Sequence, residues 1–264
     1  MSENHHNTCS KLPISVFIVT LNEAKFIEKT LNSVRQCAEV IIVDSGSTDG
    51  TVEIATRLGA KVIYNPWQGY AKQKQIAMEH CHFDWVLNLD GDEELTSSAL
   101  EALCHAMEND SHSAVRLKRI DRFIGRFPSE WVKKPNNVRF YKKRDACFDK
   151  DKLVHESAHV KGDELYLQQH FLHYGYDDID TLDAKYNTYS TLRAEEKVVQ
   201  GKCYSLLKLL AIFPLTFIKE YILCRFFLFG VRGFIKSMMA AHYAFLKEAK
   251  LYERNQKSNN KALR

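Results

Sequence analysis

A short acidic cluster follows an apolar run at residues 86–95, which read VLNLDGDEEL. Asp90, Asp92, Glu93 and Glu94 stand there with a single glycine among them. Carboxylates this close repel one another, so crowding them costs free energy unless a cation neutralises them. One interpretation is a solvated acidic loop. The other is a Mg²⁺ or Mn²⁺ ion held by Asp90 and Asp92, whose side chains point the same way on a strand and leave room for substrate phosphates in the metal shell.

Two other polar clusters stand where apolar runs end. TLNE at 20–23 follows ISVFIV, and DSGSTD at 44–49 follows EVIIV. The second cluster has two interpretations. Ser47 and Asp49 would by themselves make an Asx-type turn and a helix cap. Alternatively, Asp44 accepts hydrogen bonds from the base or ribose of a nucleotide, and the helix N-terminus behind it favours the phosphates.

Two lysines lie near the start of another predicted helix, in the segment NPWQGYAKQKQIAMEH. Lys72 and Lys74 follow Gly69, where the chain enters the helix. Cations are unfavourable at this end because the helix dipole prefers anions there. A diphosphate group would relieve that tension, although two solvated lysines also account for the pattern.

The elements that must position these clusters follow from the hydrophobic pattern. Continuous β-branched runs predict strands buried on both faces, and the segments between them have helical spacing or helix-ending residues. The predicted strands are 14–21, 39–45, 60–65 and 84–90, and the predicted helices are 24–37, 47–59 and 69–81. This alternation predicts an α/β fold with an open, mostly parallel sheet flanked by helices. Ligands bind outside the carboxyl ends of such strands, so the three polar clusters should converge on one edge.

The pattern changes after a helix that Thr96 is expected to cap. Strand-like or extended segments are expected at 113–125, 136–148 and 165–176, followed by a polar helix near 180–200. Residues 204–253 are apolar but interrupted by charged residues and a proline, and no uninterrupted stretch reaches the roughly 20 residues that span a bilayer. Such helices fit either an interfacial membrane element or a helical subdomain packed on the sheet.

Composition narrows the class of protein. The chain has 264 residues and a formal charge of only +4, which is too weak to indicate nucleic-acid binding by itself. Its seven cysteines include no C-x-x-C pair, which favours reduced thiols in a reducing compartment. The first 13 residues contain no apolar segment of the kind found in signal peptides. We therefore expect a cytoplasmic protein.

Four motifs, in this order and spacing, carry a family resemblance: FIVTLNEAKFIEKTLNSV, EVIIVDSGSTDGT, GYAKQKQIAME and DWVLNLDGDEEL. They resemble the family 2 glycosyltransferases of GT-A fold. The later RIDRFIG, VRFYKK and LVHES, with the aromatic-basic C-terminal region, resemble the branch of bacterial lipopolysaccharide inner-core β-1,4-glucosyltransferases. This chain reads DGDE where relatives often read D-A-D-E. The resemblance covers nearly the whole chain.

The resemblance implies a function and a set of site residues. It implies an inverting enzyme that moves glucose from UDP-glucose onto the inner-core heptose of lipopolysaccharide. Asp90 and Asp92 would hold Mg²⁺ or Mn²⁺, and through it the UDP phosphates, while Asp44 would read the uracil. The remaining donor-binding residues would be Thr20, Asn22, Glu23, Lys72 and Lys74.

An inverting transfer also needs a carboxylate that takes the proton of the attacking hydroxyl. Two candidates follow the D-x-D motif: Glu156 in LVHES and Asp121 in RIDRF. We prefer Glu156, because the neighbouring His155 could bind metal or phosphate and so place it at the donor. Guanidinium groups suit phosphate recognition, so candidates for steering a phosphorylated acceptor are Arg122 and Arg139, with His173 and Lys185 as weaker ones.

The expected organisation is a catalytic domain at 13–178, with a donor half at 13–110 and an acceptor half at 111–178, and a helical region at 179–254. Residues 1–12 and 255–264 are expected to be disordered tails. The cytoplasmic leaflet attracts basic segments, so we expect the helical region to dock on that membrane near its lipid-anchored acceptor. Three alternatives stay open: another UDP-sugar and cell-envelope acceptor, a non-catalytic nucleotide-sugar-binding module, and, less favoured, a haloacid dehalogenase-type phosphohydrolase.

Overall fold

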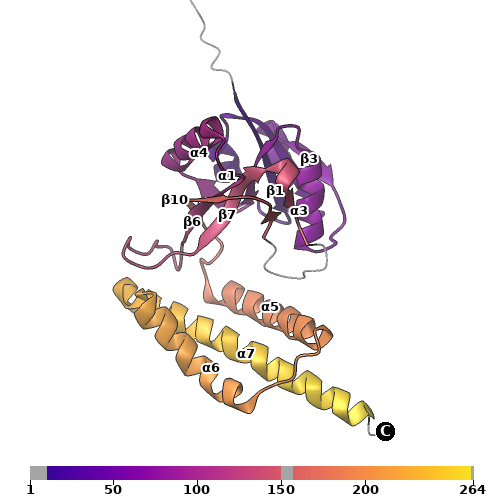
Figure 1. Ribbon diagram of the computed structural model, residues 1–264, viewed down its shortest axis with the longest axis vertical. Helices are drawn as coiled ribbons and strands as arrows, with labels where there is room; N and C mark the ends of the chain where they lie inside the picture. The colour runs from indigo at the N-terminus through magenta and orange to yellow at the C-terminus, as the bar shows by residue number, and fades with distance from the viewer. Residues whose placement is uncertain (1–10, 150–156, 263–264) are drawn as a thin grey trace, which may run out of the picture.

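A computed structural model describes residues 11–149 and 157–262 of the chain, and Figure 1 shows its two parts, a sheet domain and a helical unit. The sheet domain holds eight strands in the order β3-β2-β1-β4-β7-β6-β10-β5. Strands β3, β2, β1 and β4 are parallel, whereas β7 runs antiparallel to β4 and β6. The strands are β1 (Leu12–Thr20), β2 (Cys37–Asp44), β3 (Lys61–Tyr64), β4 (Trp85–Asp90), β5 (Glu93–Leu95), β6 (Ala114–Asp121), β7 (Asn136–Lys142) and β10 (Glu164–His173). The mostly parallel α/β sheet predicted from the sequence is confirmed.

Helices cover both faces of this sheet, because its central strands are apolar on both sides. Successive residues of β1 belong to different cores: Val16 and Ile18 pack in one cluster and Phe17 in the other. The flanking helices are α1 (Ile27–Ser33), α2 (Thr51–Arg57), α3 (Tyr70–Glu79) and α4 (Ser97–Asn109). A short pair of strands, β8 (Ala146–Cys147) and β9 (His159–Val160), lies apart from the main sheet.

The two predicted helix caps have different outcomes. Thr96 caps α4, since its side chain accepts a hydrogen bond from the backbone N–H of Ala99. Ser47 does not cap α2; the residue at that cap is Gly50, in the left-handed region, without a side-chain hydrogen bond. The hydroxyl of Ser47 instead donates to Asp44, so it stabilises the turn after β2 and not the start of the helix.

A helical unit follows the sheet domain and lies below it in Figure 1. It consists of α5 (Ile179–Val199), α6 (Leu206–Ile218), the π-helical turn η2 (Lys219–Leu223), the 3₁₀ turn η3 (Phe226–Phe229) and α7 (Gly230–Ala262). Helix α7 continues past residue 255, where the sequence suggested the start of a tail. Within the described residues, no helix combines the length and the hydropathy needed to cross a membrane.

Polar contacts attach the helical unit to the sheet domain. Lys236 of α7 forms an ion pair with Asp121 at 3.1 Å, and the Arg232 guanidinium donates to the carbonyl oxygen of Ile124 at 3.0 Å. The hydroxyl of Tyr189 on α5 donates to that of Tyr70 on α3 at 3.3 Å. Helices α5 and α7 therefore reach the edge of the sheet where the strands β1, β2 and β4 end.

Candidate active site

The three polar clusters meet at one edge of the sheet, as the sequence predicted. Thr20 pairs in register with Asp44, and Val19 with Asp90. Hydrogen bonds between side chains and backbone groups connect the loops that follow β1 and β2. Asn22 accepts a hydrogen bond from the N–H of Thr48 at 2.9 Å, and its own N–H donates to Ser47 at 2.8 Å.

Asp44 organises the loop that follows β2. One carboxylate oxygen accepts from the N–H groups of Gly46 and Ser47, and the other accepts from the hydroxyls of Thr20 and Ser47. Burial alone would raise the pKa of Asp44, but these hydrogen bonds hold it below its usual range. The Asx-type turn is therefore present. That Asp44 also reads a uracil stays a prediction.

Two cations of the protein itself neutralise the acidic loop after β4. Lys74 lies 2.9 Å from one carboxylate oxygen of Asp90, and Arg139 lies 3.2 Å from the other. Arg139 also pairs with the fully buried Glu93, whose second oxygen accepts the N–H of Asp90 at 3.0 Å. Burial opposes ionisation of Asp90, but the charges of Lys74 and Arg139 hold its pKa well below the usual range. The anion that compensates Lys74 at its helix start is thus Asp90.

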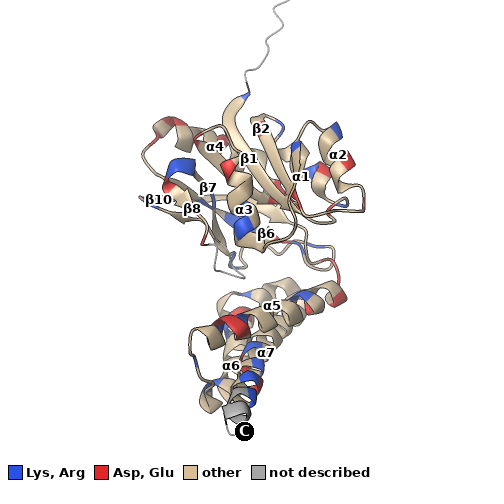
Figure 2. Ribbon diagram, turned by 90° about the vertical axis from the view of Figure 1, so that its right-hand side faces the viewer, with Lys and Arg blue, Asp and Glu red and all other residues tan. Residues whose placement is uncertain are grey.

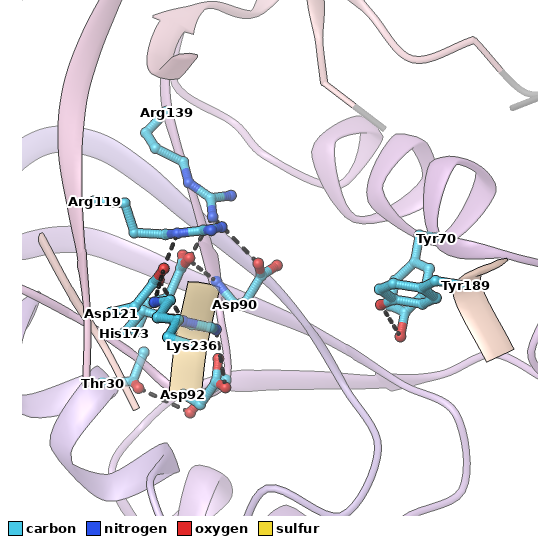
Figure 3. Close-up of polar contacts among 12 residues, drawn as sticks. Thr30, Tyr70, Asp90, Asp92, Arg119, Asp121, Arg139, His173, Tyr189 and Lys236 are labelled. Carbon is cyan, nitrogen blue, oxygen red and sulfur yellow. Dashed lines mark hydrogen bonds and ion pairs between the residues drawn. The ribbon is translucent and has the colours of Figure 1, made fainter. Parts of the chain in front are cut away.

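A line of alternating charges connects Asp92 to the helical unit (Figure 3). His173 lies 3.4 Å from Asp92 through Nε2 and 3.0 Å from Asp121 through Nδ1. Asp121 in turn pairs with Arg119 at 2.8 Å and Lys236 at 3.1 Å. Burial would lower the pKa of His173, but Asp92 and Asp121 raise it to about 9, which keeps the imidazole cationic at neutral pH.

This arrangement does not suit Asp121 for the role of general base that the sequence offered as its second choice. Burial opposes ionisation of Asp121, but Lys236, His173 and Arg119 hold its pKa far below the usual range. A carboxylate of such low pKa is a poor proton acceptor. Asp121 positions His173 instead.

A cavity of about 450 Å³ opens between the strand ends and the helix α5. Glu23, Asp90 and Asp92 line it together with Lys185. Burial, then the charges of Asp92 and Asp90, raise the pKa of Glu23 to about 8. Further lining residues are Thr20, Trp67, Tyr70, Gly91, His173 and Tyr189.

The residue Gly91 explains how Glu23 fits against the acidic loop. A Cβ at this position would lie 2.7 Å from Cγ of Glu23, so alanine there requires that flexible side chain to shift. A hydrogen bond from α1 also holds the loop, since the Thr30 hydroxyl donates to the Gly91 carbonyl oxygen at 2.9 Å. The glycine of DGDE thus allows the carboxyl groups to approach closely.

The carboxyl groups present fit a hard divalent cation. Among residues 11–149 and 157–262, no three His, Cys, Asp or Glu side chains are placed to enclose a metal without other ligands. A Mg²⁺ or Mn²⁺ site built with substrate phosphates needs only one or two carboxylates, however. Asp90 and Asp92 supply these in one cavity, where their charges add to the effect of burial in raising the pKa of Glu23.

The other predicted site residues lie in different places. Arg139 is buried under the acidic loop, and Arg122 pairs loosely with Asp177 at 3.6 Å, away from the cavity. Lys72 is exposed on α3 and does not line the cavity. His155 and Glu156 lie outside the described residues.

Sequence reasoning missed three features of the site. The aromatic lining comes from Trp67 in the segment before α3, from Tyr70 at the first position of α3 and from Tyr189 of α5. Only the local run NPWQGY gave a signal for it. Lys236 had no signal, because it is far from its partner Asp121 in the sequence. Arg119 stands with Asp121 in the segment RIDRF, but the residue types alone did not mark the two as an ion pair.

Comparison with known proteins agrees with this geometry. The model of the family described as "Glycosyl transferase family 2" matches residues 15–162. A "Lipopolysaccharide core biosynthesis glycosyltransferase LpsC" of Rhizobium meliloti is 36% identical over 93% of this chain and 94% of that protein. An uncharacterised glycosyltransferase of Rickettsia typhi is 37% identical over 94% of this chain and 89% of its own length.

A solved structure supports the fold alone. S. aureus TarS 1–349, crystallised in complex with UDP-GlcNAc, has a TM-score of 0.52 and 15% identity, covering 95% of this chain and 92% of that one. The family model and the relatives similar over nearly their full length decide the assignment. The chain belongs to glycosyl transferase family 2.

Proposed function

We propose that this glycosyltransferase is an inverting enzyme that transfers glucose from UDP-glucose to the inner-core heptose of lipopolysaccharide. The observation that carries the proposal is the position of Asp90 and Asp92 at the end of β4, in one cavity with Thr20 and Glu23. The likeness to a lipopolysaccharide core glycosyltransferase supports the acceptor class. The UDP-sugar donor is what the family resemblance implies.

In this proposal the cavity of about 450 Å³ is the donor cavity. Its residues then have separate roles. Asp90 and Asp92 would hold the Mg²⁺ or Mn²⁺ ion, which supplies positive charge to the diphosphate. Lys185 faces the same cavity, and its ammonium group lies over the rings of Tyr176 and Tyr189 at 5.2 and 5.9 Å. Its charge already acts on Glu23 and Asp92, and in this position Lys185 can stabilise the charge of the departing UDP.

The transfer itself is a single displacement. The acceptor oxygen bonds to the anomeric carbon, the bond from that carbon to the diphosphate oxygen breaks, and UDP leaves with the electron pair. The proton of the acceptor hydroxyl passes to a carboxylate base. Glu156 remains our candidate for this base.

A donor panel tests the proposal. We expect purified protein with Mn²⁺ and a heptose-containing inner-core oligosaccharide to release UDP from UDP-glucose, and to do so much more slowly without the oligosaccharide. Faster release from UDP-galactose or UDP-GlcNAc would overturn the donor assignment and keep the reaction class. UDP binding without release from any donor would favour the non-catalytic binding module.

We also propose that the helical unit docks on an anionic membrane surface. Helix α6 has no buried residue, and exposed apolar side chains continue from it through η2 and η3 into α7. We call residues 206–234 the apolar belt; Leu207 and Val231 in it are 80% and 75% exposed. The belt contains Lys208, Lys219, Arg225 and Arg232 but only one acidic residue, Glu220. In Figure 2 the ribbon of α6 is almost entirely in the tan of uncharged residues.

This charge balance favours a lipid surface over a second copy of the chain. Basic residues around an apolar face add electrostatic attraction to an anionic leaflet, by about 1 kcal/mol per Lys or Arg near the surface. Two copies of the belt facing each other would bring these same cations together. Lys133 adds a further basic residue beside the apolar belt, since its backbone N–H donates to the carbonyl oxygen of Cys224 at 3.0 Å.

The double substitution Leu207→Glu, Leu210→Glu should therefore lower binding to vesicles containing phosphatidylglycerol more than tenfold. Both leucines are exposed, so stability should change little. Val199→Glu is the matched control, because Val199 is 88% exposed but lies on α5 outside the belt. Co-sedimentation measures binding. If the wild-type protein does not bind the vesicles and elutes as a dimer, and the double variant elutes as a monomer, the belt is an interface with a second copy of the chain.

A further inference from the structure

A second cavity, of about 350 Å³, adjoins the donor cavity. The two share Asp90, His173, Lys185 and Tyr189 in their lining. A group bound in the second cavity therefore meets a group bound in the first at Asp90. This is the arrangement that a transfer between two bound molecules requires.

The floor of the second cavity is built from alternate residues of neighbouring strands. Asn88 and Asp90 follow one another at a spacing of two on β4, as Asn137 and Arg139 do on β7, so each pair shares a face of the sheet. The side-chain oxygens of Asn88 and Asn137 are buried, and neither has a hydrogen-bond partner among the residues described. Buried acceptors without a partner are rare, because they lose their bonds to water without replacement.

Helices of the C-terminal unit close the cavity from the other side. Tyr186 and Tyr189 of α5, and Tyr243 of α7, line it. Tyr176, which follows β10, adds a fourth ring. A small pocket with aromatic walls and a few convergent polar groups is typical of a site for an organic ligand. Hydroxyl donors are the groups that the two amide oxygens lack.

We propose that this second cavity is the acceptor subsite and holds the sugar ring that receives the glycosyl group. The ring's hydroxyls donate to Asn88 and Asn137, and its faces contact the tyrosines. The helical unit thus takes part in acceptor recognition, in addition to the membrane docking proposed above. The inference rests on the proposed glycosyl transfer, but it concerns where the acceptor binds and not which donor is used.

Two adjacent asparagines allow a matched test. Asn137→Leu removes an amide oxygen from the cavity, whereas Asn136→Leu removes one from the other face of β7. The Asn136 oxygen is also buried without a partner among the described residues, and it does not line the cavity. Replacing an unsatisfied buried acceptor by an apolar group of similar shape is neutral or stabilising, so neither variant should lower the unfolding temperature.

We expect Asn137→Leu to raise the KM for the heptose-containing oligosaccharide about tenfold, as the loss of one substrate hydrogen bond would. Its KM for the donor and its acceptor-independent hydrolysis of UDP-glucose should match the wild type. Asn136→Leu should leave all three unchanged. Tyr186→Leu should behave like Asn137→Leu, with the exposed Tyr252 of α7, substituted as Tyr252→Leu, as its control.

Calorimetric titration of the same oligosaccharide into UDP-loaded protein gives a result even without turnover. Weaker binding by Asn137→Leu than by Asn136→Leu supports the subsite, even if the donor assignment fails. Equal affinities, or no binding to the wild type, would overturn it. A fall in unfolding temperature that accompanies every loss of affinity would also count against it, because a structural role alone predicts that outcome.

Discussion

Asp92→Asn should lower the rate of glycosyl transfer by about 10²–10³-fold while the protein stays folded, which is the usual loss when one preorganised electrostatic group is removed. The carboxylate lies in the donor cavity, and its ion-pair partner among the described residues is His173, at 3.4 Å. The asparagine keeps its shape but loses the charge that would hold Mg²⁺ or Mn²⁺. His173 keeps Asp121 as its partner, so the loss of stability should be modest.

A control and a metal readout separate this explanation from a general charge effect. Asp84→Asn removes a carboxylate just before the same strand, where Asp84 pairs with the exposed Arg144. It should leave the rate unchanged. Paramagnetic resonance of Mn²⁺ in the presence of UDP should show weaker binding to Asp92→Asn than to wild type. Undiminished Mn²⁺ binding together with a rate near that of the wild type would remove Asp92 from the metal site.

The sheet was predictable because its signals are local. The runs before Thr20 and Asp44 are rich in β-branched residues, and the run before Asp90 is apolar apart from Asn88. Their order along the chain predicts a parallel sheet with polar ends on one edge. The helix cap at Thr96 was equally local. The prediction that Ser47 caps a helix was wrong, because its hydroxyl donates to the carboxylate of Asp44 instead. The sequence pattern does not show which of these two partners binds the hydroxyl more strongly.

The electrostatic arrangement of the site was not predictable in the same way. The sequence offered Asp121 as a base and Arg139 as an acceptor contact, but it did not show that both are buried and paired with other charges. Arg139 also lines the cavity proposed as the acceptor subsite, so its acceptor role stays a prediction. Gly175 shows the same limitation, because no motif marks it. A Cβ there would lie 2.5 Å from a carboxylate oxygen of Asp92 and 2.9 Å from His173. Contacts between residues far apart in the chain decide which carboxylate can take a proton.

Arg139→Met should destabilise the protein by about 3–5 kcal/mol, the usual cost of removing one partner from a buried ion pair. The Arg139 side chain is 7% exposed and pairs with both Asp90 and the completely buried Glu93. Asp90 keeps Lys74 as a partner, but no other cation forms an ion pair with Glu93 among the described residues. Denaturant unfolding at constant pH measures the change. Arg116→Met is the matched control, since its partly exposed pair with Glu164 should be worth at most about 1 kcal/mol.

The pH dependence of this loss identifies its cause. Burial already raises the pKa of Glu93, and removing Arg139 takes away the charge that opposes this rise. A carboxyl whose pKa is higher in the folded state costs nothing once it is protonated in both states, and its cost grows as pH rises from the unfolded pKa toward the folded pKa. The difference in unfolding free energy between Arg139→Met and wild type should therefore shrink from pH 7.5 toward pH 5.

Adding Glu93→Gln to Arg139→Met should recover most of the stability at pH 7.5, because no uncompensated charge remains at that position. A loss independent of pH and unrecovered in the double variant would mean that Arg139 stabilises the fold by packing against Phe171, whose ring centre is 5.0 Å from its guanidinium, and not by charge.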